Sequence, residues 1–403
     1  MNLLIITYEY QGQVALPNYP DTIKQLNPTT SIVVYQRLYE KLGHRGFNRY
    51  IKQLIDDEKI EAVFCLLAMD FEIHADFLAE LRQKTLVALY FGDDCTYYDM
   101  HFKYLCQGAD FVFTNIIYAE SKYLEIGIPA KFLVPAFDVS QVKPLNLERD
   151  IDVSFIGMVN NRVGRARYIN HLIKHGIRVE TYGAGTENGP VSQEKKLEIY
   201  NRSKINLDFT GLSEFTVYTL DYPIYARKKH PKGRSLEIAL SRSFLLSENA
   251  PGIEHYLTPG KEIAVFNDEN DILEKVQYYL THTEEREKLA NNAYERALRD
   301  NDLHKQCQMV LDLLKTRITE KKQEYEPIIL GRDYERNYAT YRLFHFMRFM
   351  KKLQFSFAMQ ELALWLKKPR IDLVQAIFYL GECFPIVHKI RKAFQSIWKP
   401  YRK

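Results

Sequence analysis

The chain has 403 residues, more than one ordinary hydrophobic core accommodates, so we expect two domains. Apolar residues make up 46% of it and the charges are mixed, with 55 Lys and Arg against 51 Asp and Glu, as in soluble globular proteins. Its five cysteines include no C-x-x-C pair, which argues against a zinc site and a disulfide framework and fits a reducing cytoplasm.

The amino-terminal stretch, MNLLIITYEY, has no basic region ahead of its apolar run and predicts a first strand rather than a signal peptide. No apolar run approaches the ~20 residues of a membrane-spanning helix. The sequence therefore predicts a protein that does not cross a membrane.

Apolar runs of strand length alternate with helical patterns through the first third of the chain. This alternation predicts an α/β fold with a parallel, doubly wound sheet. No G-x-G-x-x-G motif follows the first run, so nothing there supports a dinucleotide site. The expected strands are 3–8, 31–35, 62–67, 85–90, 111–114 and 130–134, and helices are expected at 47–56 and 75–82.

Two consecutive carboxylates, Asp93 and Asp94, directly follow the run at 85–90, at the carboxyl end of a strand, where sites form. Either could act as the general base that takes a proton from a hydroxyl group, or could contact an acceptor. The structural alternative is a helix N-cap, which Asp favours after a strand. His74 and His101 are weaker candidates, and we expect them to be surface or helix-packing residues.

A polar segment at 135–150, containing Pro135 and Pro144, predicts a connection between two lobes with a cleft between them. We expect the first lobe to span residues 1–140 and the second to span residues 150–303.

The second lobe opens with a strand at 152–156, followed by Gly157, a basic loop and a helix at 168–175. A helix N-terminus at this place attracts phosphate through its unpaired N–H groups and its positive dipole end. The alternative is a solvated basic loop. The loop supplies three cations suited to a diphosphate, Arg162, Arg165 and Arg167.

A strand at 178–182 leads into a glycine-rich turn that begins at Gly183, and another strand is expected at 203–209. The segment 210–233 reads as a long polar loop, and long loops over a cleft often carry function. It ends in a basic stretch that includes Lys232.

Arg234 and Glu237 lie three residues apart on the next predicted helix, 234–241, and therefore on one helical face. Beyond the carboxyl ends of a doubly wound sheet, a cation suits a phosphate and a carboxylate suits a ribose diol. A pair between these two side chains on the helix surface is the structural alternative.

The segments around this helix resemble the donor-binding region of the CgeB-like, or spore-maturation-type, glycosyltransferases. The resembling pieces are Arg-x-x-Glu at 234–237, Pro-Gly-Ile-Glu at 251–254 and Pro-Gly-Lys-Glu-Ile at 259–263, within a similarity over about residues 90–304. The resemblance implies a GT-B fold of two Rossmann-like lobes, with a group 1-like C-terminal domain that binds a nucleotide-sugar donor.

The resemblance also implies roles for individual residues. It places the donor diphosphate near Gly157, one of the loop arginines and Arg234, and the donor ribose at Glu237. The turn at Gly183 lies near the nucleotide base in related enzymes, and Lys232 belongs to the same donor region.

The sequence departs from the better-known retaining GT-B enzymes, which carry two glutamates eight positions apart. Glu237 matches the second glutamate, but residue 229 is Lys rather than Glu. The choice between inversion and retention at the anomeric carbon is therefore left open.

The last third begins with predicted helices at 272–280 and 284–299, followed by a segment at 304–331 that resembles the crossover of GT-B folds back to the first lobe. From 332 to 403 there are 15 Lys and Arg against 5 Asp and Glu, in a pattern that predicts two or three amphipathic helices. Such helices suit an anionic membrane surface, and a bundle packed on the lobes or an oligomer contact fits as well. No nucleic-acid motif accompanies this charge, so nucleic acid is not an expected partner.

These features and the resemblance together predict a glycosyltransferase that needs no cofactor besides its nucleotide-sugar substrate. The resemblance implies that it is metal-independent, because GT-B enzymes of this kind stabilise the departing diphosphate with cationic side chains and helix N-termini. The expected acceptor is a glycan, a lipid-linked glycan or a protein, in surface polysaccharide or glycoconjugate synthesis. The expected location is the cytoplasm or the inner face of the membrane. Two alternatives are a catalytically silent GT-B-fold protein that binds glycan or nucleotide, and an epimerase that acts on nucleotide sugars.

Overall fold

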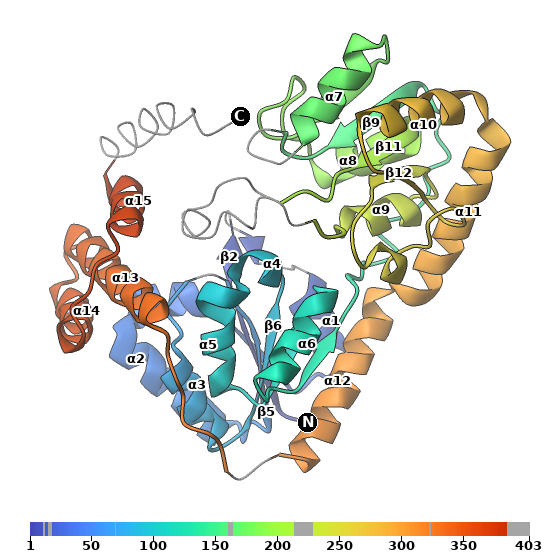
Figure 1. Cartoon of the computed structure of the whole chain (residues 1–403). Coiled ribbons are helices and arrows are strands. Elements are labelled where there is room, and N and C mark those ends of the chain that lie inside the picture. The colour runs from blue at the N-terminus through green and yellow to red at the C-terminus, as the bar shows by residue number, and fades with distance from the viewer. Residues whose placement is uncertain are drawn as a thin grey trace. The chain divides into compact units, whose positions relative to one another are not determined.

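The computed structural model describes residues 1–10, 13–14, 18–68, 70–159, 164–212, 229–321 and 324–384. The chain divides into two compact units, each with its own parallel sheet (Figure 1). The first unit comprises Met1–Thr114, Tyr118–Lys131 and Leu311–Lys403, and the second comprises Asn115–Ile117 and Phe132–Val310.

The first unit is built on a six-stranded sheet with the order β4-β1-β5-β6-β7-β8. Neighbouring strands from β4 to β7 pair in parallel. Every residue of β1, β5, β6 and β7 is buried, as expected for strands covered on both faces. The strands are β1 (Leu3–Thr7), β4 (Thr30–Val34), β5 (Ala62–Leu66), β6 (Leu86–Phe91), β7 (Phe111–Thr114) and β8 (Ala130–Phe132), and β2 (Glu9–Tyr10) pairs with β3 (Gln13–Val14) in a separate hairpin.

Helices follow most strands of this sheet, which confirms the predicted strand–helix alternation. The helix α2 bends at Gly43, where φ is 66°. A Cβ at Gly43 would lie 2.6 Å from the Phe357 ring, so this glycine permits a close approach of a C-terminal helix. The helices are α1 (Asn18–Leu26), α2 (Tyr35–Asp57), α3 (Ala75–Arg82), α4 (Asp94–Tyr97), α5 (Lys103–Leu105) and α6 (Ile117–Glu125).

The second unit contains a five-stranded parallel sheet with the order β10-β9-β11-β12-β13. Apolar side chains on its two faces form two separate clusters of buried residues. The strands are β9 (Ile151–Ile156), β10 (Val179–Tyr182), β11 (Ser203–Asp208), β12 (Leu245–Glu248) and β13 (Ala264–Phe266), and the helices are α7 (Arg165–Lys174), α8 (Gln193–Arg202), α9 (Arg234–Leu240), α10 (Glu269–Thr281) and α11 (Thr283–Asp300).

The sequence placed the start of α7 too late. The helix begins at Arg165 rather than at Tyr168, with the left-handed Gly164 as its N-cap. Arg165 and Arg167 therefore lie on the helix rather than in the loop before it. The shift has a physical reason, since Gly164 adopts a φ of 78° that ends the loop at no steric cost.

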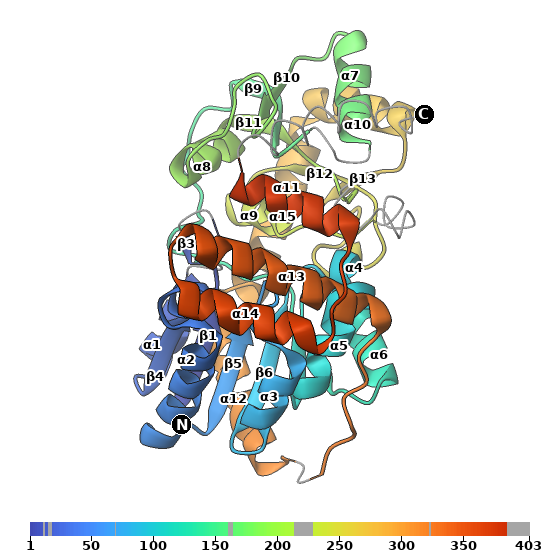
Figure 2. The same ribbon diagram turned by 90° about the vertical axis from the view of Figure 1, so that its left-hand side faces the viewer.

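The chain passes from the second unit to the first within α12 (Leu303–Thr319). Three more helices follow, α13 (Arg332–Lys351), α14 (Phe355–Lys367) and α15 (Leu373–Cys383). In the first unit α14 packs against α2, and α13 lies between α14 and α15 (Figure 2). Two doubly wound sheets with a helical C-terminal extension are the fold that the sequence predicted.

Candidate functional site

The strand order of the second sheet identifies a position suited to a ligand at the carboxyl ends of its strands. From β9 the chain moves outward to β10 on one side, whereas β11 and the later strands lie on the other side. In doubly wound sheets ligands bind beyond the carboxyl ends of the strands at such a switch point. Gly157 follows β9 and Asp208 ends β11, so both lie at this position.

A buried carboxylate holds Arg234 at this edge. The Arg234 Nη1 atom donates to Asp208 Oδ1 at 2.7 Å, and Ser235 Oγ donates to Asp208 Oδ2 at 2.7 Å. The Asp208 side chain is fully buried, while 18% of the Arg234 side chain remains exposed. The Arg234 guanidinium also lies over the Phe155 ring, 5.1 Å from its centroid. Arg234 is therefore oriented by the protein and keeps one accessible edge.

Two glycines leave room beside this arginine. A Cβ at Gly157 would lie 2.8 Å from Arg234 Nη2, and a Cβ at Gly183 would lie 2.6 Å from the carbonyl oxygen of Gly157. The Gly157 N–H donates to the carbonyl of Tyr182 at 2.7 Å. Glycine is thus needed at both positions. It lets the backbone of Gly157 lie close to Arg234, and the backbone of Gly183 lie close to that of Gly157, at the carboxyl ends of the strands.

Glu237 lies one turn further along α9 and pairs with α8. Lys196 Nζ lies 2.5 Å from Glu237 Oε1, and Gln193 Nε2 donates to the same oxygen at 3.3 Å. The alternative that Arg234 and Glu237 pair with each other is wrong, because each takes a partner from another element: Asp208 for Arg234 and Lys196 for Glu237.

A second buried carboxylate, Glu248, ends β12 and binds residues on either side of the segment 213–228, which lies outside the described residues. Its Oε2 atom accepts hydrogen bonds from the backbone N–H groups of Thr210 and Gly211, at 2.9 and 3.1 Å. Its Oε1 atom lies 2.9 Å from Lys229 Nζ, and 34% of the Lys229 side chain is exposed. Lys229 is therefore a second partly exposed cation held by a buried carboxylate.

The remaining residues predicted to bind the donor have partners of their own in the structure or lie outside its described part. Arg165 is buried and donates to the carbonyls of Met158 and Phe209, at 2.7 and 3.4 Å. Arg167 is exposed and pairs with Glu269 at 2.8 Å. Lys232 Nζ lies 2.6 Å from the imidazole of His230, and Arg162 lies outside the described residues.

The sequence reasoning missed Asp208, Glu248 and Lys196. Asp208 and Glu248 are carboxylates at the last residue of β11 and of β12, and a carboxylate at the end of each of these strands was visible in the sequence. The sequence did not reveal which cation pairs with each carboxylate. The paired residues are 19 to 41 positions apart, and only the fold brings them together.

The two predicted catalytic carboxylates in the first unit differ sharply. Asp93 is exposed and precedes α4, with no side-chain hydrogen bond to the helix end. Asp94 is buried and accepts hydrogen bonds from Thr114 Oγ1, at 2.7 Å, and from the Tyr123 hydroxyl. Burial raises the pKa of Asp94 to about 6, against the opposing effect of these two bonds. Asp93 is open to a ligand, whereas the contacts of Asp94 are those of a structural residue.

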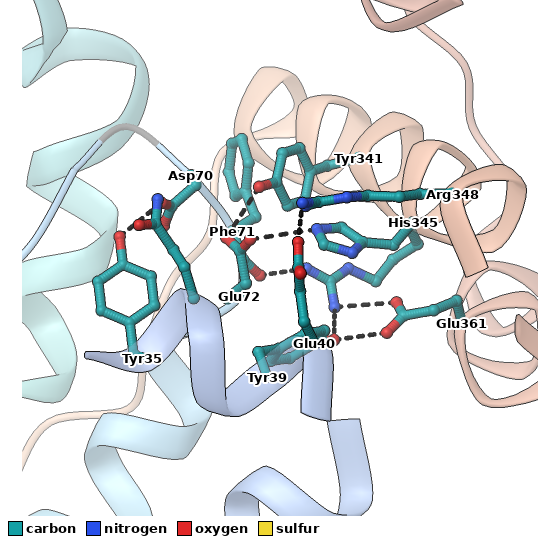
Figure 3. Close-up of polar contacts among 12 residues, drawn as sticks. Tyr35, Tyr39, Glu40, Asp70, Phe71, Glu72, Tyr341, His345, Arg348 and Glu361 are labelled. Atoms are coloured by element: carbon teal, nitrogen blue, oxygen red, sulfur yellow. Dashed lines mark hydrogen bonds and ion pairs between the residues drawn. The ribbon is translucent and has the colours of Figure 1, made fainter. Parts of the chain in front are cut away.

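A polar cluster that the sequence did not predict joins the segment 70–72 to α2 and α13. Half-buried Asp70 accepts hydrogen bonds from the Tyr35 hydroxyl at 2.5 Å and from Gln36 at 3.0 Å (Figure 3). Glu72 accepts a hydrogen bond from Tyr341 at 2.8 Å. Burial, together with the neighbouring Glu72 carboxyl, raises the pKa of Asp70 well above its ordinary value, and burial also raises the pKa of Glu72.

The same cluster continues into α14 through a fully buried ion pair. Arg342 Nη1 lies 3.0 Å from Glu361 Oε2, and the Tyr39 hydroxyl donates to Glu361 Oε1 at 2.5 Å (Figure 3). Arg342, one of the 15 basic residues between 332 and 403, therefore lies in the interior, where its guanidinium pairs with Glu361.

Three histidines of this region, His74, His101 and His345, are packing residues. His74 caps α3 by accepting a hydrogen bond from the Asp76 N–H. His101 is fully buried against the Phe71 ring, and burial lowers its pKa to about 3. His345 is also fully buried, 3.2 Å from Glu72, and burial again lowers its pKa to about 3. Burial therefore favours the neutral form of both rings.

Two searches of the described residues gave no candidates. No group of three or more His, Cys, Asp and Glu side chains among them is placed to hold a metal ion. No helix in the described part of the chain is both long and apolar enough to cross a membrane.

Comparisons with known proteins agree with the fold. Residues 165–312 match the family model described as glycosyl transferase-like. HepE from Anabaena, solved in complex with UDP and glucose, is 12% identical and superposes with a TM-score of 0.58 over 78% of this chain and 100% of its own. No curated protein matches the sequence.

Two other solved structures are similar to the same extent. Sucrose-phosphate synthase from Thermosynechococcus elongatus has 10% identity and a TM-score of 0.57, over 79% of this chain and 99% of its own. A glycosyltransferase from Rickettsia africae has 11% identity and a TM-score of 0.57 over the same shares. The chain therefore has the two-lobed GT-B fold, with a glycosyl transferase-like segment at residues 165–312.

Proposed function

We propose that this protein is a glycosyltransferase that moves a sugar from a nucleotide-sugar donor to a hydroxyl group of an acceptor. The observation that carries the proposal is the Arg234 guanidinium, which buried Asp208 holds at the switch point of the second sheet beside Gly157 and Gly183. An oriented cation next to exposed backbone suits a diphosphate. HepE, which shares the fold, was solved with UDP and with UDP-glucose.

Each part of the donor has a proposed partner. Arg234 and Lys229 bind the diphosphate, and both can stabilise the negative charge that develops on it as the sugar leaves. The Glu237 carboxylate accepts hydrogen bonds from the ribose hydroxyls, because its two hydrogen bonds among the described residues use only Oε1. These cations can neutralise the leaving group without a metal, so we propose a metal-independent transfer.

The acceptor side rests on Asp93. Its exposed carboxylate at the carboxyl end of β6 can take the proton from an acceptor hydroxyl as the new glycosidic bond forms. We propose a glycan, a lipid-linked glycan or a protein as acceptor, in surface polysaccharide or glycoconjugate synthesis in the cytoplasm, and the CgeB-like subtype on the motifs at 234–263.

The first experiment is a thermal-shift titration with UDP, GDP, CMP, dTDP and their sugar conjugates. A ligand that binds only the folded state raises the melting temperature by mass action, so one nucleotide should give a saturable shift. The Arg234→Ala variant should lose most of that shift, while Arg167→Ala should keep it. The shift should persist in EDTA.

Donor turnover then separates the proposed transfer from its alternatives. A transferase should release nucleoside diphosphate faster when the correct acceptor is present. An epimerase would instead convert the donor without an acceptor. The absence of a shift with every nucleotide would favour a silent protein of the same fold.

A further inference from the structure

Exposed apolar side chains are concentrated at the C-terminal end of the first unit. On α14, Phe355, Met359 and Leu366 are 55%, 56% and 59% exposed. Their spacing of four and then seven residues puts them on one face of the helix. On α15, Leu373 and Ile377 repeat the first step of this pattern, and both are more than half exposed.

This outward apolar face follows from how α14 is anchored. The helix turns its only carboxylate, Glu361, into the interior, where Arg342 and Tyr39 bind it (Figure 3). Gln360 also faces α2, because its side-chain oxygen accepts a hydrogen bond from the Arg45 N–H. Rotating α14 to hide its apolar face would leave Arg342 buried without its partner, which is strongly unfavourable. The exposure is therefore fixed by the fold.

Basic side chains flank both apolar stripes. Lys351 and Lys352 lie before α14, and Lys367, Lys368 and Arg370 lie between α14 and α15. All five are exposed. Nearby carboxylates neutralise only part of this positive charge, because each of them is shared by two cations. Glu40 pairs with Lys352 and Arg348, and Glu335 pairs with Lys368 and Arg370. The sequence from 385 to 403 adds six Lys and Arg and no Asp or Glu.

We propose that α14 and α15 dock on the surface of an anionic phospholipid bilayer, with their exposed apolar side chains entering the headgroup region. α13 packs against both of these helices, which form one layer in Figure 2. An anionic bilayer offers both an apolar interior and negative charge, which this surface needs. A second copy of the chain would bring the same positive charge against it and is disfavoured.

This docking goes beyond the proposed transfer reaction and does not depend on it. A helix that lies in the membrane surface needs an apolar stripe and a basic border, and does not need the length of a spanning helix. Binding by this surface should combine an apolar part, which removing the stripe abolishes, with an electrostatic part, which salt screens.

The test is sedimentation of the full-length protein with lipid vesicles. One set contains phosphatidylcholine alone, and the other contains about 30% phosphatidylglycerol, which supplies the negative surface charge. The test variant is Phe355→Ser/Met359→Ser/Leu366→Ser, and the matched control is Leu124→Ser, an equally exposed apolar residue on α6. Wild type and control should pellet with anionic vesicles, and the triple variant should lose about tenfold in partitioning.

Three outcomes overturn the proposal. One is equal pelleting of wild type and the triple variant with anionic vesicles, and another is no pelleting of wild type at low salt. The third is a concentration-dependent dimer of wild type by light scattering that the triple variant does not form, which would assign the stripe to a contact between copies. A Lys389→Gln/Arg391→Gln/Lys392→Gln variant should keep partial binding, since the α14 stripe remains.

Discussion

The two units both contain buried carboxylates paired with cations, but the cations differ in what they can reach. In the second unit Arg234 and Lys229 are 18% and 34% exposed, while the carboxylates that hold them are almost completely buried. In the first unit Arg342 and Glu361 are both fully buried. A cation that keeps an exposed edge can bind a ligand, whereas a fully buried ion pair can only stabilise the fold.

The difference follows from where each pair lies. Asp208 and Glu248 end neighbouring strands, so their cations lie at the open carboxyl edge of the sheet. Glu361 lies in the middle of a helix that packs on α13 and α2. The same chemistry therefore suits the proposed binding site at the sheet edge and anchors a helix in the interior of the first unit.

The largest effect is expected from breaking the fully buried pair of Arg342 and Glu361. Arg342→Met should lower the free energy of unfolding of the first unit by about 3–5 kcal/mol, because it leaves the Glu361 carboxylate buried without its cation. Urea unfolding followed by tryptophan fluorescence measures this change well, because both tryptophans, Trp365 and Trp398, lie in the C-terminal extension.

The control for this prediction is the double variant Arg342→Met/Glu361→Leu. Removing both charges should recover most of the lost stability, since an apolar pair replaces a buried charge pair at little cost. A single variant as stable as wild type would falsify the view of Arg342 as an anchor.

Breaking the partly exposed pair of Arg234 and Asp208 should lower activity more than stability. Arg234→Ala should lower the transfer rate by about 10²–10³-fold, because it removes a cation that stabilises charge on the leaving diphosphate. Asp208 keeps its hydrogen bond from Ser235 in this variant, and water can reach the space that the partly exposed guanidinium leaves, so the loss of stability should be smaller than in Arg342→Met. Single-turnover assays of wild type, Arg234→Ala and Arg167→Ala measure the effect, and equal rates in all three would remove Arg234 from the site.

A smaller effect distinguishes Asp94 from Asp93. The folded-state pKa of Asp94 is raised to about 6, so its contribution to stability is complete below its ordinary pKa and is lost as the pH rises through 6. Asp94→Asn should remove this pH dependence, worth up to about 3 kcal/mol between pH 4 and 7. Asp93→Asn should leave it unchanged and slow the transfer instead.

Urea titrations at a series of pH values compare these two variants with wild type. The buried histidines contribute equally to all three proteins, so the difference between the curves reports on the substituted carboxyl group. If the stability of wild type and that of Asp94→Asn change with pH in the same way, Asp94 is ionised to the same extent in the folded and unfolded states, and the prediction is wrong.

The smallest effect concerns the ribose. Glu237→Gln should weaken nucleotide affinity by about tenfold, since a charged hydrogen bond to a hydroxyl group becomes a neutral one. The loss should shrink for a 2′-deoxynucleotide, which lacks one of the hydroxyl groups. Isothermal calorimetry with both nucleotides measures this, and an equal loss for the two would place Glu237 elsewhere on the donor.

Much of the fold was predictable because its signals are local. Apolar runs and turn residues predicted the strands of the first sheet together with β9, β10 and β11, and the helical pattern of 234–241 predicted α9. Gly157 and Gly183 also stood out in the sequence, and the structure explains them by close backbone contacts.

The sequence by itself therefore determined the element types, the two sheets and the position of Arg234 at the start of α9. Only the tertiary structure decided the partners, because the order β9-β11-β12 brings Asp208 to Arg234 and Glu248 to Lys229. It also decided which face of α14 is buried. Periodicity places a lone Glu outside, but the unpaired charge of Arg342 would cost more than an exposed apolar stripe, so Glu361 lies inside.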